Sequence, residues 1–190
     1  PVMTGLESLK AIMEEYPIPV IMVSTLTKEG AEATIEAFSL GAVDFITKKS
    51  AFSEMDSIKD ELITKIRAVG KNENLKNLMT KQRLLKKAFR TEPSSKEEII
   101  RTTLPKTSHL HIEIVGIGIS TGGPKSLQEV IPLIPNNFPV PILIVQHMPQ
   151  YFTKSLAERL NSLSQINVHE VQDGQILSPG NAYIAQGGLH

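Results

Sequence analysis

Cysteine and tryptophan are both absent from this chain of 190 residues, and aromatic residues make up only 5% of it. Without cysteine the protein has no disulfide, no thiol nucleophile and no thiolate metal site. No apolar run reaches the roughly 18–20 residues of a membrane-spanning helix, and no signal peptide opens the chain. We therefore expect a cytoplasmic protein that is not embedded in a membrane.

Charge of one sign is also lacking, because 20 Lys and Arg balance 20 Asp and Glu. A net charge of zero gives no strong field toward nucleic acid or anionic membrane, so we expect no nucleic-acid partner. The hydrophobic fraction of 41% suffices for a core.

Residues 1–70 alternate between helical and strand patterns. Helices are predicted over 5–16, 28–40 and 53–69, and strands over 19–25 and 43–48. Gly41 stands where a helix commonly ends. This alternation predicts a parallel sheet covered by helices on both sides.

Residues 71–110 differ in composition, because Lys and Arg outnumber acids and a breaker cluster surrounds Pro93. We interpret this segment as a basic linker that is helical over about 76–90. The basic linker also suggests a DNA-binding output, but no basic recognition helix follows it.

Residues 111–190 again alternate. Strands are predicted over 112–119, 141–146, 166–171 and 181–185, with a helix from Thr153. A further helix, with Pro124 near its first position, carries the apolar residues Leu127, Val130, Ile131 and Ile134.

Ser120 and His147 are the candidate catalytic residues. Ser120 follows the strand 112–119 in a glycine-rich turn, near the N–H groups that open the next helix. His147 ends the strand 141–146. Parallel strands joined by one helix bring such residues to the same sheet edge, where imidazole can take the proton of a serine nucleophile.

Two other interpretations of these residues remain open at this point. Gly116, Gly118 and Gly122 also suit a dinucleotide-binding loop, although the next strand lacks the acidic residue that holds a ribose. His147 alone could be a structural histidine at a strand end. A non-catalytic nucleotide-binding α/β output domain is therefore the alternative function.

The motifs STGGP, QHMPQYFTKSLAERL and DGQILSPGNAYIA occur in this order over Ile112–His190. This part resembles the chemotaxis protein-glutamate methylesterase/protein-glutamine glutaminases, with Gln186 where that family has proline. The resemblance implies that Ser120 is the nucleophile and His147 its base. It also implies that the third member is an aspartate in a later motif beyond these 190 residues.

Other acidic and imidazole side chains receive lesser roles. Asp173, before a glycine, is interpreted as a turn residue, and His190 matches a family histidine near the site. His109, His111 and His169 are interpreted as incidental.

Residues 1–70 resemble the C-terminal half of a flavodoxin-like response-regulator receiver domain, on the motifs PVMTGLE, VIMVST and DFITK. The resemblance implies that Ser24 and Lys48 support a phosphoryl group and that Phe45 occupies the aromatic switch position. Lys49 replaces a customary proline. Receiver phosphorylation uses Mg²⁺, whose acidic ligands, with the phosphoacceptor aspartate, would precede Pro1.

We therefore expect a piece of a longer protein, cut at both ends. Its last segment would be the N-terminal part of a doubly wound, Rossmann-like methylesterase domain with no cofactor or metal. The expected reaction removes methyl esters from glutamates of methyl-accepting chemotaxis receptors and deamidates receptor glutamines. Phosphorylation of the receiver domain by a chemotaxis histidine kinase would regulate this reaction.

Overall fold

The computed structural model describes residues 2–48, 55–71 and 112–189. Below, residues 2–71 are called the N-terminal segment and residues 112–189 the C-terminal segment. The elements are α1 (Gly5–Glu15), β1 (Ile21–Thr25), α2 (Lys28–Leu40), β2 (Asp44–Lys48), α3 (Met55–Lys71), β3 (Val115–Ile119), α5 (Gly123–Val130), η2 (Ile131–Leu133), β4 (Ile142–Gln146), α6 (Phe152–Leu163), β5 (Asn167–Glu170) and β6 (Asn181–Ile184).

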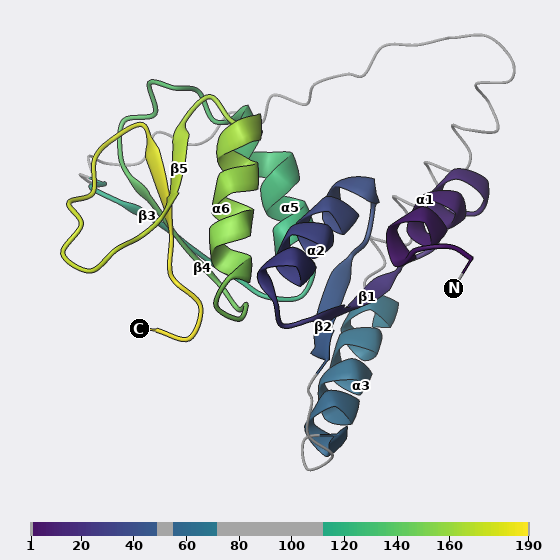
Figure 1. Cartoon of the computed structure of the whole chain (residues 1–190). Coiled ribbons are helices and arrows are strands. Elements are labelled where there is room, and N and C mark those ends of the chain that lie inside the picture. Colours follow the sequence, from purple (N-terminus) through teal and green to yellow (C-terminus); the bar gives the residue numbers. More distant parts are fainter. Residues whose placement is uncertain (1, 49–54, 72–111, 190) are drawn as a thin grey trace, which may run out of the picture.

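Two parallel sheets form the framework of the molecule (Figure 1). In the N-terminal segment β1 pairs with β2, and in the C-terminal segment the strand order is β3-β4-β6-β5. Every strand pair in both sheets is parallel. The prediction of an α/β protein with parallel strands is thus confirmed, and the predicted helix 76–90 lies outside the described residues.

Local hydrogen bonds explain where the first helices begin and end. Thr4 and Glu7 form a reciprocal capping box at the start of α1, and both hydrogen bonds from Thr4 hold the pKa of the Glu7 carboxyl below its usual value. Helix α2 begins after Thr27, whose hydroxyl accepts from the Gly30 N–H, and it ends at Gly41 with φ 113°. That positive φ explains glycine at this C-cap.

The helix predicted from Pro124 is shorter than its apolar pattern indicated. Helix α5 ends at Val130 and continues as the single 3₁₀ turn η2, because Pro132 has no N–H to extend the α-helical ladder. Leu127 and Ile131 are buried as expected, whereas Val130 is 52% exposed. Val130 therefore lies outside the buried face of this helix, although it belongs to the apolar pattern.

Helices α5 and α6 lie between the four-stranded sheet and α2, so both pack on one face of that sheet (Figure 1). On its opposite face Val145 is 54% exposed, and a Cβ added to Gly116 or Gly118 would meet no atom within 4 Å. The second helical layer expected of a doubly wound sheet is not among the described residues. Val23 of β1 is also 54% exposed, so the smaller sheet is not fully covered either.

One apolar core joins the two segments. Phe45 of β2 stacks on Phe152 of α6, with ring centroids 4.6 Å apart and an interplanar angle of 15°. A hydrogen bond of 3.0 Å from Ser39 to Gln128 links α2 to α5. None of the helices in the described part of the chain is long and apolar enough to cross a membrane.

Candidate active site

Ser120 and His147 directly follow the paired ends of two adjacent strands. Ile119 of β3 is the register partner of Gln146 of β4, and the His147 N–H donates to the Ile119 carbonyl over 3.1 Å. The residue after each strand therefore lies at the same carboxyl edge of the sheet. Both Ser120 and His147 are exposed there, within reach of solvent.

A tight turn carries Ser120 into helix α5. The Gly123 N–H donates to the Ser120 carbonyl over 2.8 Å, and Gly122 has φ 75° and ψ −1°, the dihedrals of the third residue of a type II turn. Only glycine adopts this conformation without strain. Among the described residues the N–H groups of Thr121 and Gly122 donate to no acceptor, so the turn offers two free donors beside Ser120.

A hollow of about 470 Å³ opens at this edge of the sheet. Its walls come from the ends of β3 and β4 and from the segment after β6. The lining residues are Gly118, Ile119, Ser120, Val145, Gln146, His147, Met148, Ala185, Gln186, Gly188 and Leu189. The lining is mainly apolar, and its polar side chains are one hydroxyl, one imidazole and the amides of Gln146 and Gln186, as expected of a site that accepts a neutral ester or amide.

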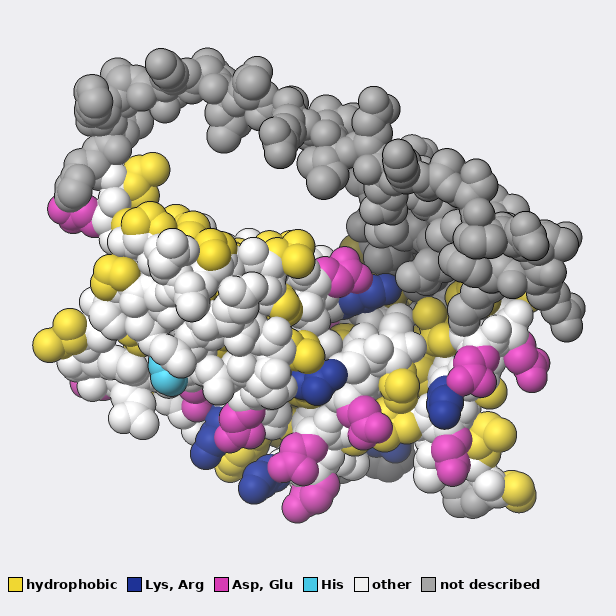
Figure 2. All heavy atoms as spheres, turned by 90° about the horizontal axis from the view of Figure 1, so that it is seen from above, with side chains coloured by type: hydrophobic (Ala, Val, Ile, Leu, Met, Phe, Trp, Pro, Cys, Tyr) yellow, Lys and Arg dark blue, Asp and Glu magenta, His cyan; other side chains and the backbone are white. Residues whose placement is uncertain are grey.

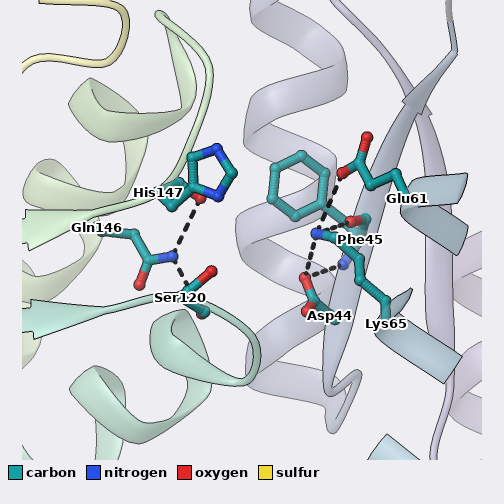
Figure 3. A network of polar contacts seen from close by, with 7 residues as sticks. All are labelled: Asp44, Phe45, Glu61, Lys65, Ser120, Gln146 and His147. Carbon is teal, nitrogen blue, oxygen red and sulfur yellow. Dashed lines mark hydrogen bonds and ion pairs between the residues drawn. The ribbon is translucent and has the colours of Figure 1, made fainter. Parts of the chain in front are cut away.

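The side-chain amide of Gln146 lies between the two loops that carry Ser120 and His147 (Figure 3). Its nitrogen donates to the Ser120 carbonyl over 3.2 Å and to the His147 carbonyl over 3.3 Å. Gln146 is only 5% exposed. One buried side chain thus connects the backbone of both candidate catalytic residues.

Contacts with the segment after β6 and with the start of α6 also fix the loop after His147. A Cβ on Gly187 would lie 2.5 Å from the Met148 carbonyl oxygen, so only glycine permits this approach of the segment after β6. Tyr151, at the start of α6, has φ 74°, a left-handed conformation that costs energy for a residue other than glycine. The next residue, Phe152, is the one that stacks on Phe45.

The N-terminal segment contributes a charged cluster near this loop. The Lys65 ammonium contacts the Asp44 carboxylate at 2.9 Å and Glu61 at 3.4 Å, and it lies 5.2 Å from the centre of the Phe45 ring. In the view of Figure 3 the Phe45 ring lies between Lys65 and His147. No residue of this cluster lines the hollow beside Ser120.

The predicted phosphoryl-site residues lie at the carboxyl edge of the smaller sheet. Ser24 pairs with Thr47 in register, and Lys48 pairs with Thr25. The Ser24 hydroxyl donates to the Gly30 carbonyl over 2.9 Å, while Lys48 is exposed. Among the described residues no group of three acidic or imidazole side chains could hold a metal ion, so this edge as described does not fit Mg²⁺.

The lesser candidates lie apart from the hollow or outside the description. Asp173 stands in an exposed turn before Gly174, whose φ is 72°, and does not line the hollow. His169 is exposed and interacts with Asn181 and Tyr183 of β6. His109, His111 and His190 lie outside the described residues.

Sequence reasoning missed the residues that position the two loops. Gln146 was noted only as the end of a strand, although a polar residue at a position facing helices is itself a signal. Gly123 and Gly187 carry no such signal, since their importance depends on neighbours distant in sequence. On the face shown in Figure 2, basic and acidic side chains of the described residues lie interspersed.

Comparison with known proteins identifies relatives for both segments. Residues 115–190 match the family model described as CheB methylesterase. A protein-glutamate methylesterase/protein-glutamine glutaminase of Halalkalibacterium halodurans is 47% identical over 192 residues, which cover 100% of this chain and 51% of the relative. The protein of the same name from Thermotoga maritima is 44% identical over 195 residues, which cover 100% of this chain and 51% of that relative.

Among solved structures, the Thermotoga maritima CheB methylesterase catalytic domain is 58% identical over the matched residues. The match covers 41% of this chain and 41% of that chain, with a TM-score of 0.40. The chain spans about half the length of the curated relatives that it matches. The names of these relatives agree with a methylesterase function rather than with the nucleotide-binding alternative.

Proposed function

We propose that the protein containing this chain is a cytoplasmic serine hydrolase of chemoreceptor glutamates, because residues 115–190 match the CheB methylesterase family model. It removes methyl esters from glutamate side chains and deamidates glutamines to glutamate. The register that sets Ser120 beside His147 at one sheet edge is the observation that carries the proposal. An imidazole ring can both accept and donate a proton, which suits the proton transfers of both reactions.

The first half of the reaction forms an acyl-enzyme. The Ser120 hydroxyl attacks the γ-carbonyl carbon of the methylated glutamate while His147 accepts the hydroxyl proton. The oxygen that becomes negative is stabilised by the free N–H groups of Thr121 and Gly122, at the positive end of helix α5. The imidazolium then returns the proton to the leaving oxygen, and methanol departs.

The second half uses water. His147 removes a proton from water, the resulting oxygen attacks the acyl carbon, and Ser120 leaves as a hydroxyl after regaining the proton. The products are methanol and a glutamate side chain. A receptor glutamine follows the same steps with ammonia in place of methanol, because its amide presents the same carbonyl.

Residues 1–70 are the C-terminal half of a receiver domain in this proposal, followed by a linker over 71–110. A histidine kinase phosphorylates the receiver, with Ser24 and Lys48 beside the phosphoryl group. The Phe45–Phe152 stack supports this regulation, since it joins strand β2 to the helix that follows His147. A small phosphodonor should raise activity, and Ser24→Ala or Lys48→Ala should weaken that increase.

The test uses the intact protein and receptors carrying radioactive methyl esters. Ser120→Ala should abolish the release of labelled methanol, because no other hydroxyl occupies its place. Ser126→Ala is the matched control: its hydroxyl donates to the Gly122 carbonyl within α5, so activity should persist. Full activity of Ser120→Ala would refute the proposal.

A further inference from the structure

The buried amide of Gln146 is the polar group that the mechanism above leaves unused. Its nitrogen donates one hydrogen bond to the Ser120 carbonyl and one to the His147 carbonyl, so each loop of the site provides one acceptor. These two acceptors also fix the orientation of the amide, because the opposite orientation would set its oxygen against both carbonyl oxygens.

The oxygen of the same amide has an unusual place. It is buried and accepts no hydrogen bond from the described residues. A Cβ added to Gly123 would collide with this oxygen, so the amide occupies the space where any other residue would carry a side chain. Gly123 opens helix α5, whose N-terminal end carries partial positive charge that suits a carbonyl oxygen.

A buried acceptor without a partner costs free energy, which offsets much of what the two donated hydrogen bonds contribute to folding. Leucine has a similar shape, and it would remove that cost along with two long hydrogen bonds. The Ser120 carbonyl would still accept from the Gly123 N–H. The glutamine is therefore explained better by what it aligns than by what it stabilises.

We propose that Gln146 is a positioning residue, which fixes the Ser120 turn and the His147 loop relative to each other from the space left by Gly123. The inference rests on the proposed function, since it concerns the alignment of the nucleophile with its base. Gln146 acts on the backbone of both residues and takes no part in the proton transfers. A misplacement of about 1 Å between reacting groups can cost on the order of 10²-fold in rate.

The first measurement compares Gln146→Leu with the intact wild-type protein. We expect kcat for methanol release to fall by about 10²-fold while KM changes less than about threefold, because receptor contacts stay in place. Thermal unfolding should remain within a few degrees of the wild type. Gln128→Leu is the matched control. Its amide nitrogen is also buried and has no partner among the described residues, its amide oxygen accepts from the Ser39 hydroxyl, and it lies on the part of α5 away from Ser120.

The second measurement changes Gly123, the other residue of the contact with the Gln146 amide. Gly123 has no positive φ, so alanine fits the backbone there and the main obstacle is the Gln146 amide. Gly123→Ala should therefore lower kcat by a similar factor. In a Gln146→Ala background the same substitution should cost less than about threefold, since the obstructing amide is gone.

A small fluorophosphonate separates this inference from the proposed function. The rate at which it modifies Ser120 depends on the alignment of serine and histidine and not on receptor recognition. Gln146→Leu and Gly123→Ala should slow this modification about as strongly as methanol release. If the wild type reacts at Ser120 but releases no methanol from receptors, the proposed substrate is wrong. The positioning role is then still tested by the rates at which the variants are modified at Ser120.

Three outcomes would overturn the positioning role. One is a kcat and a modification rate of Gln146→Leu within threefold of the wild type. Another is a loss of activity that matches a loss of folded protein in both single variants. The third is additive effects of Gly123→Ala and Gln146→Ala, because additivity would mean that the two residues act separately.

Discussion

Replacing Phe45 by alanine should destabilise both segments of the chain at once. The ring is 4% exposed and contacts three neighbours: Phe152 at 4.6 Å, Phe38 at 6.0 Å and the Lys65 ammonium at 5.2 Å. Truncation of such a buried phenylalanine costs about 3–5 kcal/mol, to which the aromatic pairs add beyond their buried area. Domains of this kind unfold with about 5–15 kcal/mol, so this loss is large.

Hydrogen exchange measured by mass spectrometry shows which elements lose protection when the free energy of unfolding falls. A loss of about 3 kcal/mol corresponds to roughly two orders of magnitude in the exchange rate of amides that open by global unfolding. We expect this acceleration in peptides from both β2 and α6, because one core joins them. Val23→Ala is the control, since that side chain is 54% exposed and its truncation should cost about 0.5 kcal/mol or less. Faster exchange in β1 and β2 with unchanged protection of α6 would refute the shared core.

Two further substitutions test the local arguments by thermal or chemical unfolding. Lys65→Met should cost about 3 kcal/mol, because it leaves the buried carboxylate of Asp44 without its cation, whereas Lys28→Met removes only an exposed pair and should cost about 0.5 kcal/mol. Equal losses in the two lysine variants would contradict this account of the buried pair. Gly122→Ala should cost about 1–2 kcal/mol through its positive φ, while Gly116→Ala, with open space around it, should be nearly neutral. A harmless Gly122→Ala would show that the turn tolerates a side chain.

The elements of the fold were predictable because their signals are local. Each strand and helix that was expected in the described residues is present, since apolar periodicity and caps such as Thr27 and Gly41 depend on near neighbours. The early end of α5 at Val130 was missed, because the helical spacing of apolar residues continued past Pro132. Pro132, two residues after the end of α5, outweighed that pattern.

The candidate site was predictable in part, for the same physical reason. Parallel strands joined by one helix bring their carboxyl ends together, which sufficed to set Ser120 and His147 at one edge. The contacts that hold the site were beyond sequence reasoning. The space for Gln146 beside Gly123 and the stack of Phe45 on Phe152 each join residues far apart in the chain.

The most direct test of the central claim locates the covalent adduct that a fluorophosphonate forms on the intact protein. Peptide mass spectrometry should find the added mass on Ser120, and His147→Ala should slow its formation by several orders of magnitude. An adduct on another residue of a fully active protein, or an adduct that forms at the wild-type rate without His147, would contradict the pairing of this hydroxyl with this imidazole.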